Sequence, residues 1–164
     1  MALRPGDEIV RVDIREGTKP DVLWDLDRFP WPFEDNEFDA IDLTDVIEHL
    51  SDIVRVLEEA HRIGKAGCRV HIATPHFSCA NSFTDPTHKH HLGVFSFDYF
   101  TSENKWDFYT TARFNKRRCE LIFHPGLLNA VVRRVARRWP ELYERRLTWI
   151  FPAWFLSVEL EVAK

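Results

Sequence analysis

Six side chains that can bind a metal ion or accept a proton are concentrated between residues 76 and 91. They are His76, Cys79, Asp85, His88, His90 and His91. Zinc prefers imidazole and thiolate ligands, and a tetrahedral site could be built from His76, Cys79, His88 and His90. Imidazole and carboxylate groups also act as general bases near neutral pH. The segment is therefore expected to line a substrate pocket, to form a structural loop or to hold a metal.

If this segment lines a pocket, its best candidates for catalysis are His76, Asp85 and His88. They would orient a nucleophile or remove its proton. A hydroxyl nucleophile needs such a base, whereas a softer nucleophile needs only to be positioned.

The charged residues are distributed unevenly along the chain. Residues 1–60 hold 17 acidic and 6 basic residues, whereas residues 113–146 hold ten basic and three acidic ones. The basic part either faces an anionic partner or contains the solvated face of a helix. The spacing of Arg133, Arg134, Arg137 and Arg138 favours the solvated face, with Val131, Val132 and Val135 opposite. Basic residues are not interleaved with aromatic ones, so binding to nucleic acid is not expected.

The elements that must position these residues alternate between strand and helix patterns. Strands are predicted at 9–14, 38–43, 68–74, within 112–123 and at 156–163, with a short extended piece at 21–24. Helices are predicted at 53–63, after an N-cap at Ser51 or Asp52, and at 126–139. Gly64 and Gly67 should end the first helix in the left-handed conformation. Two prolines make residues 29–33 a loop, pinned by its three aromatic residues.

This alternation predicts an α/β protein with a largely parallel sheet that antiparallel strands complete at the C-terminal end. The length of 164 residues fits one domain, and no repeat or linker divides it. Three cysteines (Cys68, Cys79 and Cys119) are too few and too irregularly spaced for a disulfide framework. No apolar run approaches the roughly 20 residues of a membrane helix. We therefore expect a cytoplasmic protein that does not associate with membranes.

Four motifs occur in order at 30–41, 45–50, 57–67 and 70–76. They read PWPFEDNEFDAI, DVIEHL, LEEAHRIGKAG and VHIATPH. Together they resemble the class I S-adenosylmethionine-dependent methyltransferases, in particular the type 11-like group. The resemblance covers roughly residues 9–100, and it extends to the runs DPTH at 85–88 and SFDYF at 96–100. It implies a Rossmann-like fold over residues 1–164 and methyl transfer from S-adenosylmethionine to an unidentified, for example small-molecule, acceptor.

The resemblance also implies roles for individual residues. Asp13 would accept the ribose hydroxyls, and either Asp25 or Asp27 would accept the adenine amino group, with Leu26 and Trp31 packed near the adenine. Thr44 and Asp45 match the segment under the methionine part of the cofactor. His49, after Glu48, would be a general base, a substrate contact or a structural histidine.

One part of the family pattern is missing from this sequence. The family has a first strand and a glycine-rich turn, but only eight residues precede Ile9 and they contain the single glycine Gly6. We therefore expect an N-terminally incomplete domain without the first strand, and an exposed sheet edge that favours a homo-oligomer. The alternatives are a pseudo-methyltransferase that acts as a binding or scaffold protein, and a metal-binding module built on residues 76–91.

Overall fold

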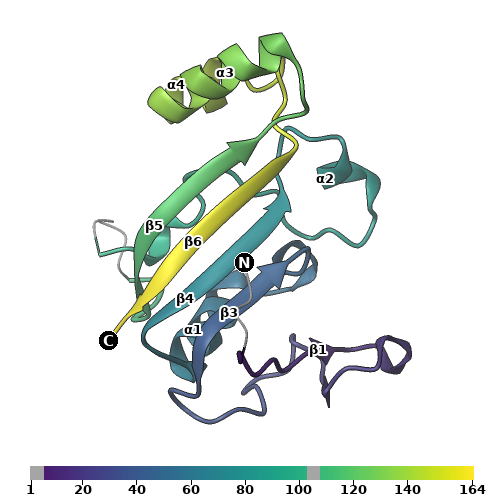
Figure 1. Ribbon diagram of the computed structural model, residues 1–164, viewed down its shortest axis with the longest axis vertical. Helices are drawn as coiled ribbons and strands as arrows, with labels where there is room; N and C mark the ends of the chain where they lie inside the picture. Colours follow the sequence, from purple (N-terminus) through teal and green to yellow (C-terminus); the bar gives the residue numbers. More distant parts are fainter. Residues whose placement is uncertain (1–5, 103–107) are drawn as a thin grey trace.

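The computed structural model describes residues 6–102 and 108–164. Its centre is a four-stranded sheet in the order β3-β4-β6-β5, formed by β3 (Phe38–Thr44), β4 (Gly64–Pro75), β6 (Phe155–Ala163) and β5 (Arg113–Ile122). Helix α1 (Ile53–Ile63) covers one face of this sheet, behind β3 and β4 in Figure 1. The expected α/β class and the antiparallel C-terminal strands are confirmed.

A second, two-stranded sheet lies beside this core. Strands β1 (Val12–Asp13) and β2 (Val22–Leu23) pair in parallel, and the 3-10 turn η1 (Glu16–Thr18) lies between them. In Figure 1 they lie beyond β3, which forms one edge of the larger sheet. Within the described ranges, no strand joins the two sheets.

The larger sheet combines parallel and antiparallel pairing. Strand β3 is parallel to β4, so that Asp42 lies opposite His71, whereas β6 is antiparallel to both β4 and β5. His71 joins three neighbouring strands, because its Nδ1 lies 3.2 Å from Asp42 Oδ2 and its Nε2 lies 3.2 Å from Ser157 Oγ. Val70 and Ile72, the neighbours of His71 in β4, lie in the core with residues of α1, so His71 lies on the other face of the sheet. That face carries no helix among the residues described (Figure 1).

Helix α1 has the bounds that the sequence predicts. Asp52 caps it by accepting a hydrogen bond from the Arg55 N–H at 3.0 Å. Its buried side chains pack on the sheet and form the main core with residues of β4 and β6; they are Val56, Leu57, Ala60 and Ile63. The parallel connection from β3 through α1 to β4 brings the ends of both strands to one edge of the sheet.

The end of α1 differs from the expectation. Gly64 does not adopt the left-handed conformation, since its φ is −75°; only Gly67, with φ +80°, does so. Strand β4 instead begins directly at Gly64. A Cβ atom at this position would lie 2.8 Å from the Ala60 carbonyl oxygen and 3.0 Å from Cys68 Cβ. Glycine is therefore required here because the helix and the strand approach closely, and not because the backbone needs a positive φ.

Short elements connect β3 to α1 and β4 to β5. They are the 3-10 turns η2 (Ile47–His49) and η3 (Asp98–Phe100) and the helix α2 (Asn81–Thr84). Beyond the ends of β5 and β6 lie α3 (Leu127–Arg138), α4 (Pro140–Leu142) and the π-helical turn η4 (Tyr143–Leu147) (Figure 1). They surround a second core cluster centred on Tyr143. The arginines of α3 are exposed as expected, but Val131 is exposed as well and Val132 is buried.

Candidate functional site

The candidate site begins where β3 ends. Asp45 follows this strand with a φ of +53°, and its N–H donates a hydrogen bond to the carbonyl of Ala73 on β4 at 2.9 Å. Asparagine and aspartate tolerate this left-handed conformation better than other non-glycine residues. The turn directs the chain into η2, which carries Glu48 and His49 at the carboxyl end of the parallel strands.

The histidine-rich segment folds back onto η2. The carbonyl of Glu48 accepts hydrogen bonds from the N–H groups of Lys89 at 2.7 Å and His90 at 3.3 Å. The imidazole rings of His49 and His88 therefore meet, with their centroids 4.6 Å apart. Residues about forty positions apart in the sequence thus form one cluster.

Hydrogen bonds fix the orientation of both imidazoles. Thr87 Oγ1 donates to Asp85 Oδ1 at 2.6 Å, so it accepts from His49 Nδ1, which lies 2.9 Å away. The carboxylate of Asp85 also accepts the Thr87 N–H, and these bonds from Thr87 lower the pKa of Asp85. His88 Nδ1 lies 3.4 Å from the carbonyl of Ser82, which can only accept. For neutral rings, this arrangement places the hydrogen on Nδ1 and the lone pair on Nε2.

Glu48 is buried beside these rings. It is 1 % exposed, and within the described residues neither of its carboxylate oxygens makes a hydrogen bond. Burial raises the pKa of the Glu48 carboxyl, and its own backbone N–H and the neighbouring Thr74 hydroxyl offset this effect only in part. A buried carboxylate without a hydrogen-bond partner destabilises the folded state, which makes Glu48 a candidate functional residue.

A second polar cluster adjoins the first through Lys89. The carboxylate of Asp27 accepts hydrogen bonds from the N–H and the hydroxyl of Ser51, each at 2.7 Å, and from Lys89 Nζ at 3.0 Å. Desolvation raises the pKa of Asp27, but these hydrogen bonds outweigh it and the net shift is downward. Asp27 therefore ties the segment after β2 both to the start of α1 and to the histidine-rich segment.

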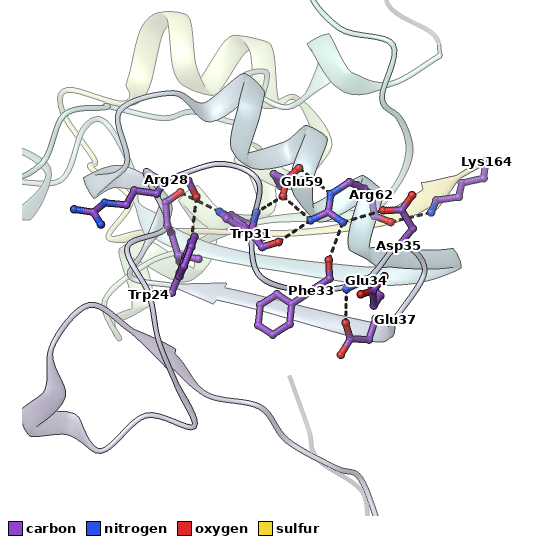
Figure 2. Close-up of polar contacts among 11 residues, drawn as sticks. Trp24, Arg28, Trp31, Phe33, Glu34, Asp35, Glu37, Glu59, Arg62 and Lys164 are labelled. Carbon is purple, nitrogen blue, oxygen red and sulfur yellow. Dashed lines mark hydrogen bonds and ion pairs between the residues drawn. The ribbon is translucent and has the colours of Figure 1, made fainter.

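Arg62 on α1 holds the loop of residues 29–37 in place (Figure 2). It donates to Glu59 through Nε at 2.9 Å and to Asp35 at 2.8 Å, and it also reaches the carbonyls of Trp31 and Phe33. Glu59 in turn accepts the Trp31 N–H at 2.6 Å. The sequence predicts a loop held by its aromatic residues, and it does not predict the contacts of Arg62. The position of Arg62 three residues after Glu59 on a helix was the available signal.

The residues expected to bind a cofactor are divided between the smaller sheet, the segment after β2 and the end of β3. Asp13 ends β1 and accepts the Arg15 N–H at 2.8 Å, a hydrogen bond that lowers its pKa. Asp25 accepts the Asp27 N–H at 3.0 Å. The Leu26 carbonyl accepts Trp31 Nε1 at 3.0 Å, and Trp31 is buried in the core. Thr44 is exposed, and its hydroxyl donates to Asp42 at 2.6 Å.

His76 belongs to a different cluster from His49 and His88. It is fully buried, with Nδ1 2.8 Å from Ser78 Oγ and Nε2 3.1 Å from Glu144 Oε1. Both ring nitrogens are therefore engaged inside the protein. The expectation that His76 orients or deprotonates a nucleophile does not fit this burial, because no substrate can reach the ring. No local pattern around His76, which directly follows Pro75, predicts that η4 covers its ring.

Metal-ligating side chains gather in a different combination from the expected one. Over the described ranges, one group of three or more His, Cys, Asp or Glu side chains has its ligand atoms within 4.8 Å of one another: Glu48, His49 and His88. His76, Cys79 and His90 are not part of it. Sequence reasoning missed Glu48 as a candidate ligand, because it lies outside the histidine-rich segment. No described helix has the length and apolar character needed to cross a membrane.

Comparisons with known proteins agree on the fold. The model of the family described as "Methyltransferase domain" matches residues 4–72. A SAM-dependent methyltransferase from Archaeoglobus fulgidus superposes with a TM-score of 0.63 at 18% identity, covering 92% of this chain and 74% of that one. An S-adenosylmethionine-dependent methyltransferase from Mesorhizobium loti gives 0.56 at 16% identity, covering 92% and 78%.

Another solved structure shows that this fold also serves other chemistry. The [4+2]-cyclase SpnF superposes with a TM-score of 0.53 at 16% identity, covering 85% of this chain and 54% of the cyclase. No curated protein sequence matches the chain. The methyltransferase-domain model thus matches residues 4–72, less than half of the chain, and the fold is similar to that of the solved S-adenosylmethionine-dependent methyltransferases.

Proposed function

We propose that the chain binds S-adenosylmethionine and transfers its methyl group to an acceptor. The observation that carries this proposal is the position of acidic residues at the carboxyl ends of parallel strands: Asp13 ends β1 and Asp25 and Asp27 follow β2 in the smaller sheet, and Asp45 follows β3 in the larger one. Open α/β sheets bind their ligands at the carboxyl ends of their parallel strands. The family-model match over residues 4–72 supports the same conclusion.

The cofactor roles follow from the chemistry of each side chain. An ionised carboxylate accepts two hydrogen bonds, which suits Asp13 to the two ribose hydroxyls. We assign the adenine amino group to Asp25 or Asp27, with Leu26 beside the ring. Thr44 ends β3 and Asp45 follows it, and we assign both to the methionine part.

On the acceptor side, we assign substrate contact to His49 and His88 and a positioning role to Asp85. The acceptor nucleophile forms a bond to the methyl carbon while the carbon–sulfur bond breaks, with inversion at carbon, and S-adenosylhomocysteine leaves. Holding the two reactants in line supplies most of the rate enhancement in such a reaction. The Nε2 atoms of both rings are the polar groups available to orient the acceptor.

The alternative is a cofactor-free binding or scaffold protein, since a fold alone does not determine the reaction. For either function we propose a cytoplasmic location, where the three free cysteines stay reduced. Self-association through the edge strand β3 is part of the proposal.

Isothermal titration calorimetry with S-adenosylmethionine tests the proposal. We expect one equivalent to bind, and Asp13→Asn to weaken binding at least 10-fold, as expected for loss of a hydrogen bond to a charged group. Should the chain bind none, the titration is repeated with protein extended by the upstream coding sequence. Absence of binding in both proteins would contradict the cofactor assignment and favour the scaffold alternative.

A further inference from the structure

We propose that Glu48, His49 and His88 form a binding site for a divalent first-row transition cation such as Zn²⁺. Two imidazoles and one carboxylate are a ligand set typical of such cations. One ligand atom from each side chain lies within 4.8 Å of the other two. No comparison assigns a metal to these residues, and cation binding here does not depend on methyl transfer.

The first argument is the state of the two imidazoles. His49 Nδ1 donates to Thr87 Oγ1, which donates to Asp85, and His88 Nδ1 faces the carbonyl of Ser82. Metal-binding histidines usually donate their second ring N–H to a carboxylate, a carbonyl or a hydroxyl in this way. In this tautomer, the Nε2 atom of each ring carries the lone pair that a cation would bind.

The second argument is independent of the histidines. Glu48 is 1 % exposed, and both of its oxygens are without a hydrogen-bond partner among the residues that the structure describes. Buried carboxylates are normally paired or bound to a metal. One carboxylate oxygen of Glu48 and one ring nitrogen of each histidine lie within 4.8 Å of one another, and one cation would bind all three.

Charge and geometry also suit a cation. The carboxylate of Asp85 lies 3.9 Å from His88 Nε2 and adds negative charge at the rim of the site. In tetrahedral zinc sites the ligand atoms lie about 3.4 Å apart, so binding draws the three side chains together through small changes of side-chain torsions. Three protein ligands leave at least one coordination position open, as in catalytic zinc sites. If the proposed methyl transfer holds, a hydroxyl of the acceptor would occupy that position.

The test uses untagged protein from which metals have been removed with a chelator. Zn²⁺ is titrated by competition calorimetry, and Co²⁺ is titrated in parallel for its ligand-field absorption spectrum. We expect one equivalent of each to bind, and the Co²⁺ spectrum to show nitrogen and oxygen ligands. Binding of Zn²⁺ should also raise the thermal midpoint of the native protein.

Variants localise the site. His49→Gln, His88→Gln and Glu48→Gln should each weaken Zn²⁺ binding at least 100-fold. Thr87→Val should weaken it about 10–100-fold and keep the stoichiometry, as loss of a partner that orients a ligand does. His91→Gln is the matched control, since His91 is exposed three residues after His88 and stacks on Phe83 instead. It should bind like the native protein.

Two results would overturn the proposal. One is the absence of stoichiometric Zn²⁺ binding by the native protein. The other is equal weakening by His91→Gln and His88→Gln, which would indicate adsorption to surface histidines. If circular dichroism shows that Glu48→Gln is unfolded, His49→Gln and His88→Gln decide the matter. The calorimetric titration with S-adenosylmethionine is performed on metal-free protein, so its failure is distinguishable from failure of the cation site.

Discussion

His49 Nδ1 and Thr87 Oγ1 lie 2.9 Å apart, although 38 residues separate them in the sequence. Because Thr87 Oγ1 donates its own hydrogen to Asp85 at 2.6 Å, it must accept from the imidazole. One hydroxyl thus sets the tautomer of His49 and attaches the histidine-rich segment to the turn after β3.

This relationship predicts a tautomer that can be measured. In metal-free protein at pH 8, His49 should carry its hydrogen on Nδ1, as seen by the nitrogen chemical shifts of its ring in a long-range ¹⁵N–¹H spectrum. Thr87→Val removes the acceptor and should shift His49 toward the Nε2–H tautomer that is favoured in free imidazole. Thr84→Val, an exposed threonine in the same segment, should leave the spectrum of His49 unchanged. An Nε2–H tautomer in the native protein would contradict the assignment.

The two candidate adenine contacts, Asp25 and Asp27, should differ in their effect on stability. Asp27→Asn weakens the hydrogen bonds from Ser51 and Lys89, so we expect the free energy of unfolding in urea to fall by about 1–3 kcal/mol. Asp25→Asn loses an exposed ion pair with Arg28 and should cost less than about 1 kcal/mol.

Calorimetry on the same two variants identifies the adenine contact. The variant that weakens S-adenosylmethionine binding at least 10-fold carries the residue that accepts the adenine amino group. Unchanged affinity in both variants would show that neither aspartate contacts the cofactor.

Arg62 should contribute more to stability than other basic residues with an ion pair. Arg62→Met leaves Glu59 and the carbonyls of Trp31 and Phe33 without their donor, so we expect a loss of about 2–4 kcal/mol in urea unfolding. Lys65→Met is the control, because Lys65 pairs only at the surface with the exposed Asp39, and it should cost at most about 1 kcal/mol. Equal losses in both variants would contradict the role given to Arg62.

The same contacts predict a dependence of stability on pH. Desolvation raises the pKa of Glu59, but the hydrogen bonds from Arg62 and Trp31 outweigh it, so the pKa in the folded state is below its ordinary value of 4.5. The stabilisation is therefore present above pH 4.5 and is lost as the pH falls through the lower folded-state pKa. Unfolding titrations between pH 7 and pH 3 should show this loss in the native protein and a shallower slope in Arg62→Met. Identical slopes would indicate that Arg62 does not set the ionisation of Glu59.

The elements of the fold were predictable where local signals agree. An aspartate N-cap followed by apolar residues at helical spacing gave α1 its observed bounds, Ile53–Ile63. The alternation of polar and apolar residues gave β6 within one residue. Gly64 illustrates the limit, since a glycine after a helix suggests a left-handed cap, whereas here it allows a strand to pass close to Ala60.

The candidate site was predictable only in part, because its residues are brought together by tertiary contacts. His49 and His88 were recognised singly, but their meeting depends on the backbone hydrogen bond from Lys89 to Glu48, which no local pattern encodes. The burial of His76 depends on Glu144 in η4, 68 residues away. Glutamate is usually a surface residue, so the sequence gives no reason to single out Glu48. Its burial without a hydrogen-bond partner among the described residues is visible only in the structure.

The central claim is that the carboxylates after β1, β2 and β3 bind S-adenosylmethionine, and calorimetric titration of the protein with that cofactor tests it most directly. We expect one binding site, with affinity at least 10-fold weaker in Asp13→Asn than in the native protein. Native affinity in Asp13→Asn, or no binding by the native protein with or without the upstream coding sequence, would contradict it.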